Sequence, residues 1–472
     1  MALHELNARC AQNREIVCQM RKLLIANRGE IACRVARSAK SLGIATVGVY
    51  SEADAEALHV KRCDEAVLLG PAKAADSYLN VDRVIAAAKQ TGADAVHPGY
   101  GFLAENAEFA GRVIREGLIW VGPSPDQILA MGDKERARGI ADAAGVPVLK
   151  GSPRFAVGNI DGLVAAADAV GYPLLVKASA GGGGIGMRLV EGPEQIEKTV
   201  ASTQAMAERS FGDGTIFLER FIAKARHIEI QVFGFGDGRA VHFYERECSI
   251  QRRFQKVIEE APAVGFPHEM RDQMSQAAIA LSEAESYSGA GTAEFIVDAQ
   301  SNEFYFLEMN TRIQVEHPVT EMTTNSDLVA LQIKLARGDD LSFLTQDSIQ
   351  QTGHAIECRL YAENPNKMFM PSPGTLDKFR LPNADESVRI DSGVVEGDVI
   401  TPYYDPMLAK VICKGETRAS ALDLMIKSLN STTIEGIANN VEFLEKVVSH
   451  SNFQRGDVFT GFIDAYKSDL IN

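Results

Sequence analysis

Residues 304–318, which read FYFLEMNTRIQVEHP, combine a strand-like pattern with side chains that can do chemistry. Polar and apolar positions alternate: Glu308, Asn310, Arg312, Gln314 and Glu316 against Leu307, Met309, Ile313 and Val315. A period of two predicts a half-buried strand. Its polar face holds carboxylates, amides and a guanidinium, which are groups that bind metal ions and anions. The pattern alone is compatible with a solvated sheet face as well as with the wall of an active site.

The preceding residues belong to the same predicted β-hairpin, since residues 291–310 read GTAEFIVDAQSNEFYFLEMN. If Asp298 faces Phe304, the same register places Glu294 directly across from Glu308. Two like charges in that relation repel each other, so we expect a cation between them. A magnesium ion with oxygen ligands meets this need. A register shifted by one residue would instead turn one glutamate toward solvent.

The composition is that of a globular protein of 472 residues, enough for about three domains. A net charge of −15 argues against a nucleic-acid partner. The seven cysteines are scattered without a CxxC pair, which indicates a reducing compartment and excludes a disulfide framework or a zinc site. The sequence contains no apolar run of about 18 residues and no secretory signal, so we expect a cytoplasmic protein without a membrane partner. Residues 1–20 are expected to form a tail or short helix.

The N-terminal part predicts a doubly wound parallel sheet. A strand at residues 22–27 is followed by a helical pattern and a second strand at residues 44–50, and this order is typical of a parallel sheet covered by helices. The first strand lacks a GxGxxG motif, so a dinucleotide site is not indicated. Four polar side chains follow the strand that ends at residue 96, where such sheets bind ligands, although a single histidine there is as often structural. They are His97, Tyr100, Glu105 and Asn106.

A glycine-rich segment follows at residues 172–192, YPLLVKASAGGGGIGMRLVEG, in which two apolar strands flank consecutive glycines at 181–184. Successive glycines weaken a strand, but their N–H groups can close over an anion. We therefore expect a lid over nucleotide phosphates; a flexible hairpin tip is the alternative. Lys177 lies in the first strand, and a buried ammonium needs an anionic partner, which a phosphate would supply.

Two further alternating strands are predicted on either side of a turn at residues 236–238. They end in a group of mixed charges that includes Arg252, Arg253, Lys256, Glu259 and Glu260. Such a mixture usually forms a lattice of surface salt bridges that contributes little to stability. A helix near residues 270–286 and a strand containing Arg359 complete the prediction.

From about residue 21 to its end the chain resembles biotin carboxylase, the ATP-grasp component of biotin-dependent carboxylases such as acyl-CoA carboxylases. The matching stretches occur in the family's order: IANRGEIA, HPGYGFLAEN, MGDK, KASAGGGGIGM, RHIEIQV, SIQRR, EMNTRIQVEHPVTE, HAIECR and PYYDPMLAK. The resemblance implies an α/β protein with an ATP-grasp fold. Its expected parts are an extension (1–20), an N-terminal doubly wound parallel-sheet domain (21–150), a glycine-rich lid subdomain (151–222), a catalytic subdomain (223–352) and a C-terminal mixed domain (353–472).

The resemblance also implies a ligase reaction. Magnesium ATP phosphorylates bicarbonate, and the resulting carboxyphosphate supplies carbon dioxide to the ureido nitrogen of biotin. Two magnesium ions are expected, with manganese as a substitute, held by Glu294, Glu308 and Asn310. The ATP-binding residues implied by the family are Lys134, Lys177, Gly181, Gly182, Gly183, Gly184, Met187, Glu219, Arg220, Ile222, His227 and Gln251.

The catalytic group implied by the family surrounds bicarbonate and biotin. It consists of Lys256, Arg312, Gln314, Val315, Glu316 and Arg359. Glu316 is the expected base that removes the proton of bicarbonate, and Arg359 would stabilise the biotin enolate. A carboxylate beside an arginine keeps a low pKa and is ionised at neutral pH, which suits such a base.

Two positions depart from the family's pattern. Phe254 stands where a histidine is common, and Ile185 replaces a basic residue of the lid. Both changes remove hydrogen-bond donors and are expected to affect affinity or acceptor preference. A nucleotide-binding regulatory subunit with weak catalysis and an ATP-grasp ligase for another carboxylate are the alternative functions.

Partners follow from the same resemblance. The sequence contains no biotinylation motif and no segment of carboxyltransferase size. We therefore expect either a fragment of a longer protein or a subunit that acts with a separate biotin carboxyl carrier protein and a carboxyltransferase. The family also allows a homodimer. The final acceptor of the carboxyl group is left open.

Overall fold

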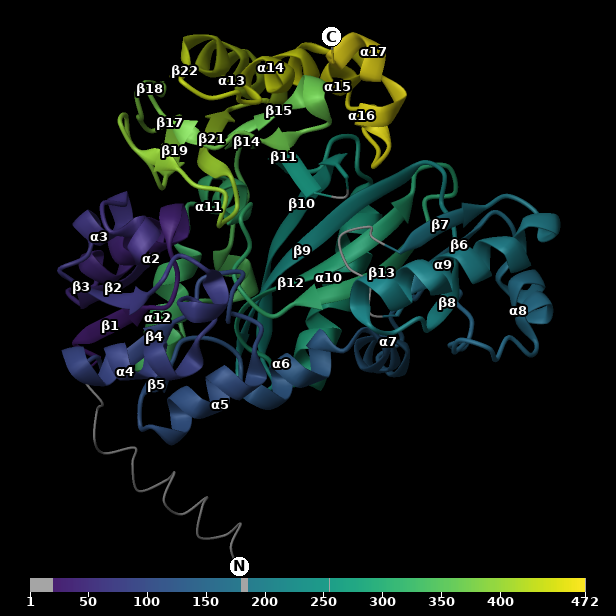
Figure 1. The fold of residues 1–472 in the computed structure, drawn as a ribbon, viewed down its shortest axis with the longest axis horizontal. Coiled ribbons are helices and arrows are strands. Elements are labelled where there is room, and N and C mark those ends of the chain that lie inside the picture. The colour runs from purple at the N-terminus through teal and green to yellow at the C-terminus, as the bar shows by residue number, and fades with distance from the viewer. Residues whose placement is uncertain (1–19, 180–185, 254, 472) are drawn as a thin grey trace, which may run out of the picture.

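The computed structural model describes residues 20–179, 186–253 and 255–471 (Figure 1). The expectations for the N-terminal tail, the glycines at 181–184, Ile185 and Phe254 fall outside these ranges, as does the side chain of Lys134. In the described part of the chain, no helix has both the length and the apolar character needed to cross a membrane.

The N-terminal domain is the predicted doubly wound parallel sheet, with strand order β3-β2-β1-β4-β5. The strands are β1 (Lys22–Ile25), β2 (Ala45–Ser51), β3 (Glu65–Gly70), β4 (Ala95–His97) and β5 (Ile119–Trp120). The helices are α2 (Gly29–Ser41), α3 (Leu58–Arg62), α4 (Val81–Thr91), α5 (Ala107–Arg115), α6 (Pro125–Gly132) and α7 (Lys134–Ala143). Asp133 caps α7 by accepting hydrogen bonds from the N–H groups of Glu135 and Arg136. This cap explains why the helix begins at Lys134.

A small lid subdomain projects to one side of the molecule (Figure 1). It contains α8 (Leu163–Val170), β6 (Leu174–Ala178), β7 (Met187–Val190), α9 (Ile196–Phe211) and β8 (Ile216–Arg220). Strands β6 and β7 pair antiparallel on either side of the glycine run, as the sequence predicts. Strand β6 lies between β7 and β8 in an antiparallel sheet. A compact apolar cluster between this sheet and the two helices gives the subdomain its own core.

The centre of the molecule is an eight-stranded antiparallel sheet with strand order β13-β12-β9-β10-β11-β14-β21-β19. Its strands are β9 (Ala225–Phe235), β10 (Ala240–Arg252), β11 (Gln255–Ala261), β12 (Ser288–Asp298), β13 (Phe304–Asn310), β14 (His354–Tyr361), β19 (Val388–Ser392) and β21 (Met407–Gly415). The sheet runs on across the expected domain boundary at residues 352 and 353. The catalytic subdomain and the C-terminal domain therefore share one sheet.

Helices cover the sheet at several places: α10 (His268–Ala284), α11 (His317–Thr324), α12 (Leu328–Arg337), α13 (Arg418–Ser431), α14 (Val441–Ser449), α15 (Ser451–Arg455), α16 (Phe462–Ala465) and α17 (Lys467–Leu470). Short paired segments complete the C-terminal part: β15 (Glu363–Asn364), β16 (Met370–Pro371), β17 (Gly374–Thr375), β18 (Lys378–Arg380), β20 (Val399–Ile400) and β22 (Thr433–Glu435).

The two faces of β9 have opposite character. Ile228, Ile230 and Val232 belong to a buried apolar cluster that includes residues of α10. Glu229 and Gln231 alternate with them and point to the other face, where they are also fully buried. Because a strand turns successive side chains to opposite faces, this alternation builds an apolar core on one side of the sheet and a polar wall on the other.

Candidate active site

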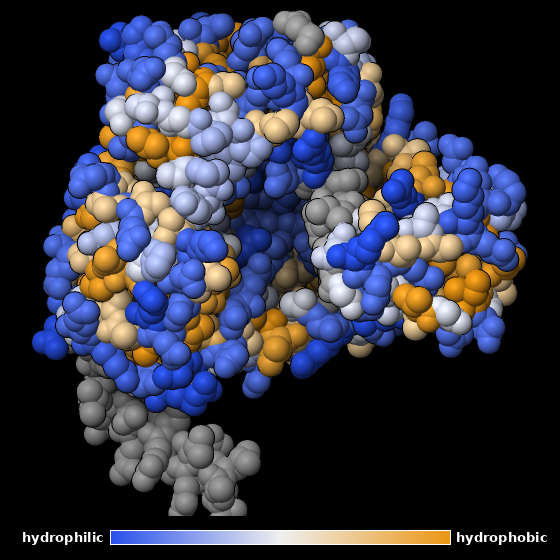
Figure 2. All heavy atoms as spheres, in the orientation of Figure 1, coloured by the Kyte–Doolittle hydropathy of each residue, from blue (hydrophilic) through white to orange (hydrophobic). Residues whose placement is uncertain are grey.

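A cavity of about 860 Å³ lies where the N-terminal domain, the lid and the eight-stranded sheet meet. Figure 2 shows it as a hydrophilic hollow between the two sides of the molecule. Its lining includes Tyr100 of the N-terminal domain, Lys177 of the lid, and Glu294 and Arg359 of the central sheet. The polar wall of the sheet thus faces a space large enough for a nucleotide and a small second substrate.

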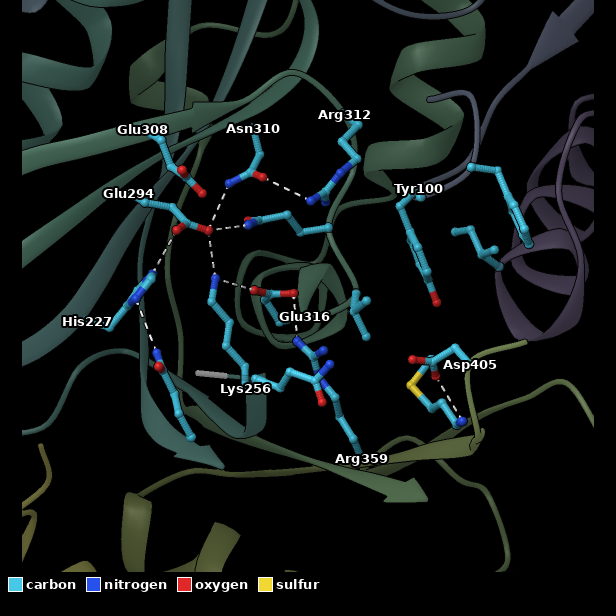
Figure 3. Close-up of a pocket in the computed structure, with 18 of the residues that line it drawn as sticks. Tyr100, His227, Lys256, Glu294, Glu308, Asn310, Arg312, Glu316, Arg359 and Asp405 are labelled. Carbon is cyan, nitrogen blue, oxygen red and sulfur yellow. Dashed lines mark hydrogen bonds and ion pairs between the residues drawn. The ribbon is translucent and has the colours of Figure 1, made fainter. Parts of the chain in front are cut away.

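Lys256, on β11, is the cation at the centre of this wall (Figure 3). Its Nζ lies 2.6 Å from Glu229 Oε2, 2.8 Å from Glu294 Oε1 and 2.8 Å from Glu316 Oε1. Burial lowers the pKa of Lys256, but the carboxylates outweigh burial and hold its pKa well above the ordinary value. The ammonium is therefore charged, and its ion pairs connect β11 to β9, to β12 and to the segment that precedes α11.

The prediction that the charged residues around Lys256 form a lattice of surface salt bridges is wrong. Lys256, Glu259 and Glu260 are shielded from solvent, and the two glutamates are almost completely buried. The cause is the position of β11, which lies between β10 and β14 inside the sheet rather than at its edge. A local charge pattern cannot reveal which strands flank it.

Glu316 follows β13 and precedes α11, and its carboxylate lies between two cations. Its Oε1 is 2.8 Å from Lys256 Nζ, and its Oε2 is 3.0 Å from Arg359 Nη2. Burial alone would raise the pKa of Glu316, but Lys256, Arg359 and Arg246 lower it far below its ordinary value. The prediction of an ionised carboxylate beside an arginine is confirmed, and that arginine is Arg359.

The β12–β13 hairpin pairs Glu294 with Glu308, as predicted. The register near the turn differs from the predicted one, because Phe304 faces Val297 rather than Asp298. An irregularity between Glu294 and Phe295 shifts the register by one residue, so that Glu294 still pairs with Glu308. Both glutamates line the cavity, so the alternative with one glutamate in solvent is excluded. Figure 3 shows the two carboxylates side by side.

Glu294 is the acceptor for several neighbours. Its Oε1 receives hydrogen bonds of 2.8 Å from Lys256, Asn310 and Gln314. Its Oε2 lies 3.1 Å from Nε2 of His227, which was expected near adenosine. Burial raises the pKa of Glu294, but Lys256 and His227 bring it well below its ordinary value. The Lys256 ammonium thus supplies a positive charge beside Glu294, one of the two glutamates between which the sequence predicts a cation.

The residues predicted to hold magnesium fit a hard cation. The carboxylates of Glu294 and Glu308 are oxygen donors at one edge of the cavity, and Asn310, whose nitrogen donates to Glu294 and whose oxygen accepts from Arg312, would have to turn its amide to offer an oxygen to the ion. A second set of possible ligands overlaps with this one, since ligand atoms of His227, Glu229 and Glu294 lie within 4.8 Å of one another. Glu229 was not predicted from the sequence.

Arg312 is held from two sides. Its Nε donates to Glu105 Oε2 at 3.0 Å, and its Nη2 donates to Asn310 Oδ1 at 2.9 Å. Glu105 lies in the loop between β4 and α5, where the sequence predicts ligand-binding residues. The polar loop of the N-terminal domain therefore reaches the site through an arginine of the central part.

The nucleotide side of the cavity contains a second buried carboxylate. Glu219 of β8 forms ion pairs with Lys177 and Arg138. Burial raises the pKa of Glu219, but these two cations bring it below its ordinary value. The anionic partner that Lys177 requires is therefore Glu219 in this structure, and the role of Lys177 toward phosphate stays a prediction.

The other predicted ATP residues divide into two groups. Met187, His227 and Gln251 line the cavity. Among the residues that the structure describes, Arg220 and Ile222 lie outside the cavity lining. Arg220 donates a hydrogen bond of 3.3 Å to the hydroxyl of Tyr305, and Ile222 packs in a small apolar cluster.

Comparison with known proteins agrees with this geometry. Three family models match in order: "Biotin carboxylase, N-terminal domain" at residues 19–128, "Carbamoyl-phosphate synthase L chain, ATP binding domain" at 133–344, and "Biotin carboxylase C-terminal domain" at 357–465. Biotin carboxylase 1 of Bacillus subtilis is 48% identical over 447 residues, which are 95% of this chain and 99% of that protein. The chain belongs to the biotin carboxylase family.

Solved structures of the family have the same fold. A biotin carboxylase from Campylobacter jejuni has a TM-score of 0.90 at 41% identity and covers 95% of this chain and 99% of that one. The biotin carboxylase domain dimer of the Hydrogenobacter thermophilus 2-oxoglutarate carboxylase, a complex with MgADP, ADP and bicarbonate, also has a TM-score of 0.90, at 40% identity with 96% and 99% coverage. These matches confirm the ATP-grasp fold that the resemblance implies.

A longer relative is also similar. The α subunit of methylcrotonoyl-CoA carboxylase from Oryza sativa is 49% identical over 451 residues, which are 96% of this chain. The chain spans 61% of the length of that relative.

Proposed function

We propose that this chain catalyses the ATP- and bicarbonate-dependent carboxylation of biotin through carboxyphosphate. The observation that carries the proposal is the buried, ionised Glu316 between Lys256 and Arg359 at the wall of the cavity. The Hydrogenobacter relative, a complex with MgADP and bicarbonate, supports it.

In the proposed first step, Glu316 takes the proton of bicarbonate, and an oxygen of the resulting carbonate attacks the γ-phosphate of ATP, so that ADP leaves and carboxyphosphate forms. Lys256, Arg312 and Gln314 would hold the anion, since all three line the cavity together with Glu316 and carry N–H donors. Magnesium bound by Glu294, Glu308 and Asn310 would supply positive charge to the phosphates. Phosphoryl transfer depends largely on such positioning and neutralisation of charge.

In the second step, carboxyphosphate would split into carbon dioxide and phosphate, and the ureido nitrogen of biotin, beside Arg359, would give its proton to that phosphate and form a bond to the carbon dioxide. Arg359 already touches Glu316 and also lies 2.5 Å from Glu259, so its guanidinium is held in place before any substrate binds. On the nucleotide side, Lys177, which pairs with Glu219, would exchange this carboxylate for a phosphate oxygen, and Lys134 and the glycines at 181–184 are proposed to join it.

The proposal includes biotin carried by a separate carrier protein, a carboxyltransferase as second partner, a homodimer and a cytoplasmic location. Of these, the dimer has a parallel in the Hydrogenobacter relative, a domain dimer.

The test is the release of ADP from ATP in the presence of bicarbonate and free biotin. We expect release that depends on both. ADP release that is the same with and without biotin would favour a ligase for another carboxylate. Tight nucleotide binding without any release would favour a regulatory subunit. Either outcome would contradict the proposal.

A further inference from the structure

Arg246 of β10 is a fully buried arginine directly behind the proposed bicarbonate site. It makes five hydrogen bonds: Nε to Glu229 Oε1 (2.5 Å), Nη1 to Gln231 Oε1 (2.7 Å) and Thr320 Oγ1 (3.0 Å), and Nη2 to Thr292 Oγ1 (3.1 Å) and Gln314 Oε1 (2.7 Å). A guanidinium carries five N–H groups in a rigid plane. All donors of Arg246 are therefore used within the protein, and the residue is not a direct ligand for substrate.

The sequence of the strands explains how these partners meet. Arg246 pairs with Glu229 across β10 and β9, and Gln231 and Thr292 face each other across β9 and β12. Their side chains share the polar face of the sheet. Gln314 approaches the same guanidinium from the segment between β13 and α11.

The contact with Arg246 decides which way the Gln314 amide points. A guanidinium only donates hydrogen bonds, so the atom of Gln314 that faces it must be the carbonyl oxygen. The amide nitrogen then faces the other way and donates to Glu294 Oε1 at 2.8 Å. A flipped amide would turn N–H groups toward the guanidinium and an oxygen toward the carboxylate, and both contacts would be repulsive.

The orientation of Gln314 matters because this residue lines the cavity. With its oxygen fixed by Arg246, the side chain keeps its nitrogen on the other side, where one N–H group donates to Glu294 and the second is the donor that an anion in the cavity would need. The same guanidinium binds Oε1 of Glu229 and leaves Oε2 to accept from Lys256 at 2.6 Å. One buried residue thus determines the hydrogen-bonding direction of two groups beside the proposed bicarbonate site.

We propose that Arg246 is a positioning residue for bicarbonate, acting by fixing the Gln314 amide with its N–H groups toward the anion. This inference rests on the proposed function, because it assigns Arg246 a task in the same site.

The principal test is Arg246→Lys. Lysine keeps the positive charge, but its three N–H groups leave one atom and cannot span the five acceptors. We expect the KM for bicarbonate to rise by about 10-fold or more, since charge-assisted hydrogen bonds are the strong ones, while the KM for ATP changes by less than about twofold. Steady-state ADP release with one substrate varied at a time measures both.

Arg226→Lys is the matched control. Arg226 lies on β9 and donates to Glu247 Oε2 at 2.8 Å, so it also forms a buried ion pair between β9 and β10, yet it does not line the cavity described here. This variant should lose thermal stability as Arg246→Lys does but keep the wild-type KM for bicarbonate. An equal rise in both variants would mean that Arg246 acts only through stability and would overturn the inference.

A double-mutant cycle with Gln314→Met tests the route of the effect. If Arg246 acts through Gln314, the two changes are less than additive in their effect on the KM for bicarbonate; full additivity would contradict the inference.

Thr292→Val removes only one acceptor of Nη2 and is the alternative variant if Arg246→Lys fails to fold. It should shift the same constant in the same direction by a smaller factor, and an unchanged constant would overturn the inference. A wild-type protein without bicarbonate-dependent ADP release would instead refute the proposed function.

Discussion

Two buried glutamates near the cavity have pKa values shifted in opposite directions, and the difference lies in their neighbours. Glu316 touches Lys256 and Arg359, which lower its pKa despite burial. Glu357 of β14 is as completely buried, and burial together with the nearby charge of Glu259 raises its pKa well above the ordinary value. Glu316 is therefore favoured as a carboxylate that can accept a proton, whereas burial favours the protonated form of Glu357.

This contrast gives a prediction for one substitution at two sites. Glu316→Gln removes the proposed base and should lower bicarbonate-dependent ADP release by about 100-fold or more, the size of a typical general-base effect. Nucleotide binding, measured by titration calorimetry, should remain. Glu357→Gln imitates the protonated acid and should leave both quantities near the wild-type values. Unchanged turnover in Glu316→Gln would refute the role of the base.

At the scale of elements, β11, β14 and α13 meet at Glu260. This carboxylate accepts from His354 Nε2 at 2.6 Å and from Arg418 Nε at 2.7 Å. Burial raises the pKa of Glu260, but the hydrogen bond from His354 and the charge of Arg418 lower it from 4.5 to about 2. The interaction joins the central sheet to the C-terminal helices.

The shift predicts how acid affects stability. Between pH 4.5 and about 2, Glu260 is protonated in the unfolded chain but ionised in the folded protein. The contribution of Glu260 to the free energy of unfolding is therefore complete above pH 4.5 and is lost as the pH falls toward 2. A shift of this size corresponds to about 3 kcal/mol. Urea unfolding should show Glu260→Gln less stable than wild type by about that amount at pH 7, with the difference shrinking in acid. Parallel curves from pH 7 to pH 3 would contradict this account.

At the scale of the whole molecule, the cavity is assembled from parts that are distant in the chain. Tyr404 of the C-terminal part contacts Ser51 of the N-terminal domain, at 2.5 Å between their hydroxyl oxygens. Glu105 of the N-terminal domain accepts from Arg312 of the central part. The proposed bicarbonate ligand Arg312 is therefore correctly placed only when these parts are packed together.

We predict that Glu105→Gln raises the KM for bicarbonate by about 3- to 10-fold, because a charge-assisted bond to Arg312 becomes a weaker neutral one. The melting temperature should change little, since the Glu105 side chain is 41% exposed. Glu108→Gln, at an exposed position in α5, is the control with the same change of charge and should leave the KM unaltered. Equal effects of the two variants would indicate a general electrostatic influence rather than a specific contact.

The sequence by itself determined the elements and the residue types of the site. Alternation in residues 304–316 predicted one polar strand face; the structure makes a strand only of Phe304–Asn310, and residues 311–316 form a connecting segment that still carries Arg312, Gln314 and Glu316 to the cavity. The order of strands and helices identified the N-terminal parallel sheet. Alternation could do this because the two-residue period of a strand is a local property of the backbone. The motifs in their order then indicated the family and most of the residues that line the cavity.

Only the tertiary structure decided which charges meet. The local charge pattern placed Lys256 in a surface lattice, although the family resemblance assigned it to the site. Arg246, Glu229 and Arg138 were not singled out, because burial and ion pairing depend on strands and loops far apart in sequence. The pairing of Glu294 with Glu308 was predicted, but the irregularity that produces it was not, since strand register is set by packing across the sheet. The sequence thus determines which chemical groups are present. Their ionisation and orientation depend on the low-dielectric environment and the neighbouring charges of the folded protein.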